Sequence, residues 1–120
     1  MKWFRFDASV SRTIDKFDSV HASISKVLRI TQAEHLHIGC IHLGPNGILG
    51  HHPAPVPQLF LVVQGEGWVR GEGEERVRIE AGQAVFWETG EGHESGTESG
   101  MTAIVIEGDQ LDPSQYMPAL

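Results

Sequence analysis

The sequence has little of several features that would place it in a special class of protein. Its one cysteine, Cys40, excludes any disulfide bond within the chain and gives no sign of an oxidising compartment. The longest apolar run, residues 59–63, is far shorter than the about 20 residues that a membrane helix needs. The first residues carry no apolar core of a secretory signal. We therefore expect a cytoplasmic protein with no membrane partner.

Glycine, proline and basic residues are each missing from one part of the chain. Residues 1–38 contain neither glycine nor proline, whereas all fourteen glycines lie between Gly39 and Gly108. Six of the nine lysines and arginines fall in residues 1–29, and none follows Arg78. Nucleic acid binding requires a positive face, and a formal net charge of −7 argues against one. We therefore expect solvated basic side chains and no nucleic acid partner.

The glycine-rich part of the 120-residue chain has the pattern of short strands separated by turns. Residues 77–80 alternate between apolar and polar side chains, which is typical of a half-buried strand. Residues 59–63, 84–87 and 103–106 are apolar on both faces, so both faces need cover. Glycine-rich turns recur about every 8 to 12 residues, the spacing of a β-sandwich or barrel. The sequence therefore predicts one all-β domain.

The N-terminal third predicts further strands. Residues 3–6 and 19–30 are rich in β-branched and aromatic side chains, with a loop or helical turn between them at residues 11–17. Residues 35–43 are another strand candidate. Residues 111–120 carry two prolines, which indicates a C-terminal tail.

Two segments combine glycines with histidines at defined spacings. In the later segment, Gly82, Gly90 and His93 are spaced as G-x7-G-x2-H. This spacing resembles, without a gap, the second motif of the cupin family, G-x5-P-x-G-x2-H-x3-N. Glu88 stands where the family has proline, and Thr97 stands where it has asparagine.

The first family motif, G-x5-H-x-H-x3–4-E-x6-G, is matched less fully. Gln58 lies seven residues before Gly65, at the position of the family's glutamate. Only one histidine of the pair is present, whichever spacing applies. The two spacings assign the pair either to His52 and Ala54 or to His51 and Pro53.

The resemblance implies a jelly-roll barrel, also called a double-stranded β-helix, with extra N-terminal strands. The barrel would span residues 35–110, residues 1–34 would pack on it as strands or an arm, and residues 111–120 would form the tail. Members of the family hold a metal inside the barrel with two histidines, a glutamate and a later histidine. Carried over, the metal ligands are His52, Gln58 and His93, and the cofactor is a divalent transition metal such as zinc, nickel, manganese or iron.

The departures from the family pattern weaken such a site. A glutamine in place of glutamate keeps a carbonyl oxygen but loses the negative charge, and the alanine removes a strong donor. The remaining set is neutral, so it would hold a divalent ion less tightly. Three outcomes follow: a metal-free site for an organic ligand, a metal held loosely with several waters, or a substitute histidine. The candidate substitutes are His51, His42 and His37.

These observations favour a small cupin that binds a small molecule in its barrel, with a weak or modified metal site. His51, Phe60 and Phe86 are the predicted ligand-binding residues, and no catalytic residue is assigned. The alternatives are a metal-dependent enzyme, such as an isomerase, dioxygenase or decarboxylase, and a structural dimeric domain without a ligand. We expect a homodimer, since a partner barrel would cover the two-sided strands, as the N-terminal segment also would.

Overall fold

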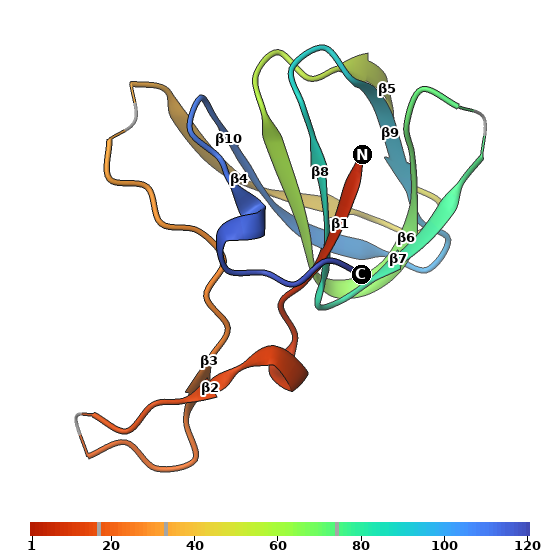
Figure 1. Ribbon diagram of the computed structural model, residues 1–120. Helices are drawn as coiled ribbons and strands as arrows, with labels where there is room; N and C mark the ends of the chain where they lie inside the picture. The colour runs from red at the N-terminus through yellow and green to blue at the C-terminus, as the bar shows by residue number, and fades with distance from the viewer. Residues whose placement is uncertain (17, 33, 74) are drawn as a thin grey trace.

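The computed structural model describes residues 1–16, 18–32, 34–73 and 75–120, so Phe17, the last residue of the predicted turn, lies outside the described residues (Figure 1). Within them the chain forms ten strands and two 3-10 helices, neither of which is long and apolar enough to cross a membrane. In chain order the elements are β1 (Lys2–Arg5), η1 (Ala8–Val10), β2 (Arg12–Thr13), β3 (Ser23–Ile24), β4 (Leu36–Leu43), β5 (Ile48–Pro53), β6 (Gln58–Arg70), β7 (Val77–Glu80), β8 (Gln83–Trp87), β9 (Gly92–Gly96), β10 (Met101–Gly108) and η2 (Pro113–Gln115).

Strand β6 joins the two sides of a barrel. Its first half lies in a sheet of order β1-β8-β6-β10-β4, in which every pairing is antiparallel. Its second half leaves that sheet and pairs with β7 and β9, and β9 pairs in turn with β5. Figure 1 shows the strands curling around a common interior. The predicted all-β jelly-roll barrel is confirmed.

Side-chain alternation along the strands divides the core into an inner and an outer layer. The inner layer lies inside the barrel, since it takes residues from both sides: Phe60, Val62, Val69, Ile79, Val85, Trp87 and Val105 are among them. The outer layer lies beneath the chain ends and includes Phe4, Leu59, Leu61, Ala84, Phe86 and Met117. Apart from Val63, which is 46% exposed, the runs that are apolar on both faces are therefore covered on both faces by the chain itself.

The N-terminal segment forms less strand than its composition predicts. The strand expected over residues 19–30 is reduced to β3, which pairs only with β2 (Figure 1). Val20 is 76% and Ile24 is 48% exposed, so these two β-branched residues of the arm have no sheet to pack on. The helical turn comes earlier than predicted, at η1, because the Asp7 side chain accepts a hydrogen bond from the Ser9 N–H at 2.9 Å.

The C-terminal segment returns to the barrel. Leu120 N–H donates to the Trp3 carbonyl at 3.0 Å, and Arg5 N–H donates to the Pro118 carbonyl at 3.2 Å. Met117 is buried in the outer layer. These residues and the N-terminal segment cover the outer face of β6 and β8. The apolar faces of these two strands therefore give no reason to expect a partner barrel. The outer face of β4 stays open, with Ile38 60% exposed, and a homodimer stays a prediction.

Two glycines of the matched motifs lie in turns with positive φ but differ in the space available for a side chain. Gly65 and Gly90 both have positive φ, +80° and +87°, which an L side chain adopts with strain. A Cβ on Gly65 would overlap the carbonyl oxygen of Gly100, whereas a Cβ on Gly90 would meet open space. We expect Gly90→Ala to lower the free energy of unfolding by about 1 kcal/mol and Gly65→Ala by about 3 kcal/mol. Urea unfolding of the two variants measures the difference, and equal losses would contradict the close approach at Gly65.

Candidate functional site

Three inward-facing side chains form a row at one end of the barrel. Glu107 of β10, Gln58 of β6 and Trp87 of β8 are direct register partners across neighbouring strands. Alternation gives them the same orientation as Val105, Phe60 and Val85 of the inner layer. Gln58 and Trp87 are 6% and 1% exposed, and Glu107 is half-buried, so the row runs from the core toward solvent.

Two histidines stand beside this row on the opposite sheet. His52 of β5 and His93 of β9 are register partners, and their rings meet edge to face with centroids 4.5 Å apart. The His93 ring also stacks on Trp87, with centroids 4.1 Å apart and planes 14° apart. Trp87 therefore links the histidine pair to Gln58. The structure thus groups the three predicted metal ligands around Trp87, a residue that the sequence analysis did not assign to the site.

The hydrogen bonds of the two histidines fix which ring nitrogen keeps its lone pair. Nδ1 of His52 lies 2.7 Å from the Gly50 carbonyl oxygen, and Nδ1 of His93 lies 3.1 Å from the Glu91 carbonyl oxygen. A carbonyl oxygen only accepts, so each Nδ1 carries the proton and donates it. In the neutral rings Nε2 is therefore the acceptor. Burial lowers the pKa of His93, and the nearby His52 lowers it further, so His93 is neutral at pH 7.

Gln58 and Trp87 each bury a polar atom without a partner. Gln58 Nε2 donates to Glu107 Oε1 at 2.7 Å, an orientation fixed by the carboxylate, which only accepts. Its other amide atom, Oε1, is buried and makes no hydrogen bond with the described residues, and the same holds for Trp87 Nε1. Burying a donor or an acceptor without a hydrogen bond lowers the stability of the fold by about 1–3 kcal/mol for each group. Such a pair is typical of a place where water or a ligand completes the bonding.

Glu107 is the site residue that the sequence motifs missed. Both matched motifs end before it, and it follows the apolar run at residues 103–106. The signal was nevertheless present, because strand alternation puts residue 107 on the same face as Ala103 and Val105. The family position at 58 has lost its carboxylate, and the neighbouring strand supplies one within hydrogen-bond distance of Gln58.

The structure does not bring all the predicted ligand-binding residues together. Phe60 lies in the inner layer, with its ring centroid 5.8 Å from that of Trp87. Phe86 points the other way, into the outer layer with Phe4, because it alternates with Trp87 along β8. Its assignment to the barrel interior is therefore corrected. His51 is exposed and lies against the backbone of Gly92, at the rim of the site.

Of the candidate substitute histidines, one lies beside the group and one on the opposite face of its strand. His37 is the register partner of Glu107 on β4, but its side chain is exposed. His42 is exposed on the outer face of the same strand. Ala54, where the shorter motif spacing would put the second histidine, is buried in the inner layer. The barrel thus contains a small apolar side chain at the place of a metal ligand.

These residues do not fit a tightly held resident metal ion. In the described parts of the chain, no group of three or more His, Cys, Asp or Glu side chains is arranged to hold one. What the site offers is two imidazole Nε2 atoms and one amide oxygen, with the carboxylate of Glu107 already bonded to Gln58. A divalent ion there would lack both a full ligand set and charge neutralisation.

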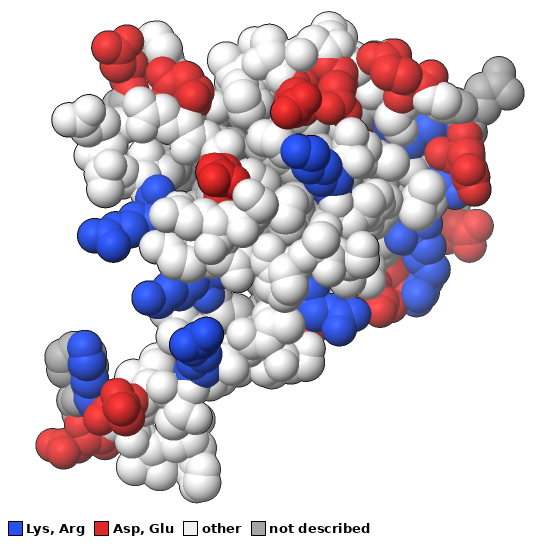
Figure 2. All heavy atoms as spheres, in the orientation of Figure 1, with Lys and Arg blue, Asp and Glu red and all other residues white. Residues whose placement is uncertain are grey.

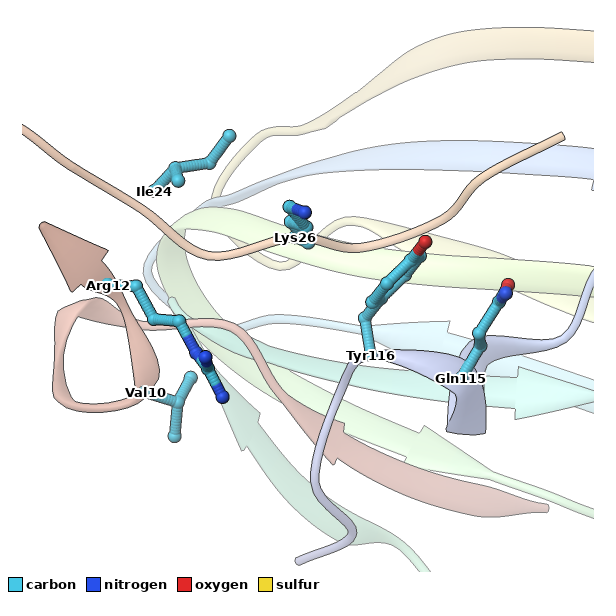
Figure 3. Close-up of a pocket in the computed structure, with 6 residues that line it drawn as sticks. All are labelled: Val10, Arg12, Ile24, Lys26, Gln115 and Tyr116. Atoms are coloured by element: carbon cyan, nitrogen blue, oxygen red, sulfur yellow. The ribbon is translucent and has the colours of Figure 1, made fainter. Parts of the chain in front are cut away.

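A separate groove of about 350 Å³ lies between the arm and the C-terminal segment. Figure 3 shows the residues that line it: Val10, Arg12, Ile24, Lys26, Gln115 and Tyr116. Lys26 Nζ lies 5.6 Å from the centre of the Tyr116 ring. This groove shares no residue with the histidine group and has a basic rather than an acidic lining. In Figure 2, by contrast, acidic side chains gather along the upper edge, where Figure 1 shows the loop between β8 and β9.

Comparisons with known proteins agree with this architecture. The family model described as the cupin domain matches residues 39–107, and no match is found among curated proteins. A conserved protein of unknown function from Streptococcus pyogenes is 17% identical, with a TM-score of 0.58 over 72% of this chain and 73% of that one. A cupin superfamily protein from Desulfitobacterium hafniense is 13% identical, with a TM-score of 0.59 over 76% and 84%. A predicted oxalate decarboxylase from Thermotoga maritima is 21% identical, with a TM-score of 0.56 over 61% and 65%.

The matched family model covers more than half of the chain and includes both motif segments from Gly47 to Thr97. The solved structures share its fold over most of their length. The chain belongs to the cupin domain family.

Proposed function

We propose that the chain binds a small organic molecule at the mouth of the barrel, through His52, Gln58, His93 and Glu107. The observation that carries this proposal is the buried pair of unpartnered atoms, Gln58 Oε1 and Trp87 Nε1. Native interiors rarely leave such atoms unsatisfied, and a ligand with a few polar groups would satisfy both.

The packing of the barrel determines where such a molecule would sit. Phe60, Trp87 and the aliphatic residues of the inner layer fill the interior behind the histidines. His52 and Glu107 are half-buried and His51 is exposed, so the site opens to solvent at this end. The ligand would therefore enter from this end and pass between His52 and Glu107 to reach the buried atoms of Gln58 and Trp87.

A metal-dependent enzyme is the second candidate. The two Nε2 lone pairs that face no carbonyl favour it, since metal-binding histidines are commonly held through Nδ1. One protein of similar fold is a predicted oxalate decarboxylase. Because the carboxylate and the second histidine of the family set are displaced, we propose that any divalent transition metal is held weakly here. Full metal occupancy that survives dialysis against a chelator, measured by elemental analysis, would favour the enzyme instead.

A fragment titration followed by NMR tests the binding proposal. We expect bound fragments to shift the indole N–H resonance of Trp87, assigned with Trp87→Phe, and the ring resonances of His93. His93→Ala should weaken this binding by about tenfold or more, since it removes an acceptor and the ring stacked on Trp87. His42→Ala, on the outer face of β4, is the matched control and should leave it unchanged. Fragments that bind without moving these resonances would place the site elsewhere.

A further inference from the structure

The polar atoms at the barrel mouth are strongly unbalanced between acceptors and donors. His52 Nε2, His93 Nε2 and Gln58 Oε1 are acceptors, and the Glu107 carboxylate is a fourth group that only accepts. Trp87 Nε1 is the one donor atom among the residues of this group that makes no hydrogen bond with the described residues. A ligand that satisfies them must therefore bring several N–H or O–H donors and one acceptor.

The charge at the barrel mouth is negative. Glu107 is the one acidic side chain of the group, and a carboxylate accepts about four hydrogen bonds, of which Gln58 supplies one. The nearby N-terminal amine is already paired with Glu91 at 2.8 Å. The site therefore attracts cations and repels carboxylates or phosphates.

The rest of the barrel strengthens this preference. Residues 35–120 carry twelve of the sixteen acidic side chains but only three of the nine basic ones. Acidic groups also gather at the edge of the molecule near the loop between β8 and β9 (Figure 2). An approaching anion would meet a negative field before it reached the mouth.

We propose that the mouth recognises a small amino alcohol, with its primary ammonium group on Glu107 and the histidine acceptors and its hydroxyl group between Gln58 Oε1 and Trp87 Nε1. An ammonium group supplies three donors and the positive charge. A hydroxyl group donates once and accepts once, which satisfies an orphan acceptor and an orphan donor together. This inference rests on the proposed function and specifies the class of ligand.

Three molecules of matched size test the assignment on the full chain. 3-Amino-1-propanol, 1,3-propanediol and 3-hydroxypropionate share one hydroxyl end and differ in the other, which is cationic, neutral or anionic. Titrations followed at the Trp87 indole resonance should show the amino alcohol binding at least about tenfold more tightly than the other two. If the diol or the hydroxy acid binds equally well, the ligand class is wrong while the binding site stands. If none of the three moves this resonance, both this inference and the proposed function fail.

A charge variant tests the role of Glu107. Glu107→Gln keeps an oxygen for the Gln58 amide but removes the charge, so the preference for the amino alcohol over the diol should fall to within about twofold. Glu98→Gln removes the same charge from an exposed position just after β9 and should leave the preference intact. The double variant Gln58→Glu/Glu107→Gln exchanges the two groups, keeps the charge, and should restore the preference. A preference that survives in Glu107→Gln would overturn the assignment.

Discussion

Replacing Gln58 with glutamate is expected to destabilise the metal-free chain and to raise its affinity for a divalent transition metal about a hundredfold. The substituted carboxylate would lie within hydrogen-bond distance of Glu107 and would replace the N–H that now donates to it. Two carboxylates so close cannot both be ionised without a cation, so folding in chelator should lose about 2–4 kcal/mol. A bound metal would relieve this repulsion, and the two histidine Nε2 atoms would complete a set of four ligands.

Thermal unfolding with and without zinc measures both halves of this expectation. The melting temperature of Gln58→Glu should lie below that of the parent chain in chelator and rise with zinc, while the parent should respond little. The control is Gln58→Glu/Glu107→Gln, which places the carboxylate at the family position without creating a carboxylate pair. It should regain stability in chelator and bind zinc less tightly than the single variant. A single variant that is as stable as the parent in chelator would show that Glu107 does not adjoin Gln58 in solution.

This expectation depends on a residue that the sequence motifs alone did not reveal. Gln58 and His93 were found because the family spacing extends over them. Glu107 lies on a strand that neither motif includes, and only the pairing of β10 with β6 places it beside Gln58. Local periodicity groups residues 103, 105 and 107 on one face, but it does not say which face points into the barrel. That choice is made by the closure of the sheets.

The same limit explains the misplacement of Phe86. Residues 84–87 are apolar at every position, so alternation in hydrophobicity is absent and the inner and outer sets look alike. The structure resolves them because Trp87 meets His93 and Phe60, whereas Phe86 lies beneath the chain ends. Strand β9 was not predicted either, because its sequence from Gly92 to Gly96 is polar and rich in glycine. It is a strand because β5 and β6 offer it two partners.

The chain ends depend on non-local contacts to a still greater degree. The segment after Leu111 has turn-forming residues, and nothing in its sequence indicates that Met117 is buried. Its position follows from an apolar outer face of the barrel that requires cover. In the arm, β-branched residues favoured a long strand, but an isolated pair of strands has no sheet to extend it.

Trp87→Ala is expected to lower the free energy of unfolding by about 3–5 kcal/mol. The side chain is 1% exposed and is among the largest that are fully buried. It fills the inner layer against Phe60 and gives the His93 ring its stacking surface. Alanine would leave a cavity at the junction of the two sheets, so the resonances of His93 and His52 should shift and broaden as well.

Trp87→Phe separates the packing of the ring from its polar atom. Phenylalanine keeps an aromatic face for His93 but removes the unpartnered indole N–H, whose burial costs about 1–3 kcal/mol. Because that gain offsets part of the lost volume, this variant should unfold within about 1.5 kcal/mol of the parent chain. Urea unfolding of both variants in the absence of ligand makes the comparison. If phenylalanine proves as destabilising as alanine, Nε1 already has a partner in solution, and the hydroxyl position assigned to the ligand is taken. If Trp87→Phe is instead more stable than Trp87→Ala by the expected amount, Nε1 has no hydrogen-bond partner in the ligand-free chain. Binding of a hydroxyl group should then stabilise the parent chain but not Trp87→Phe.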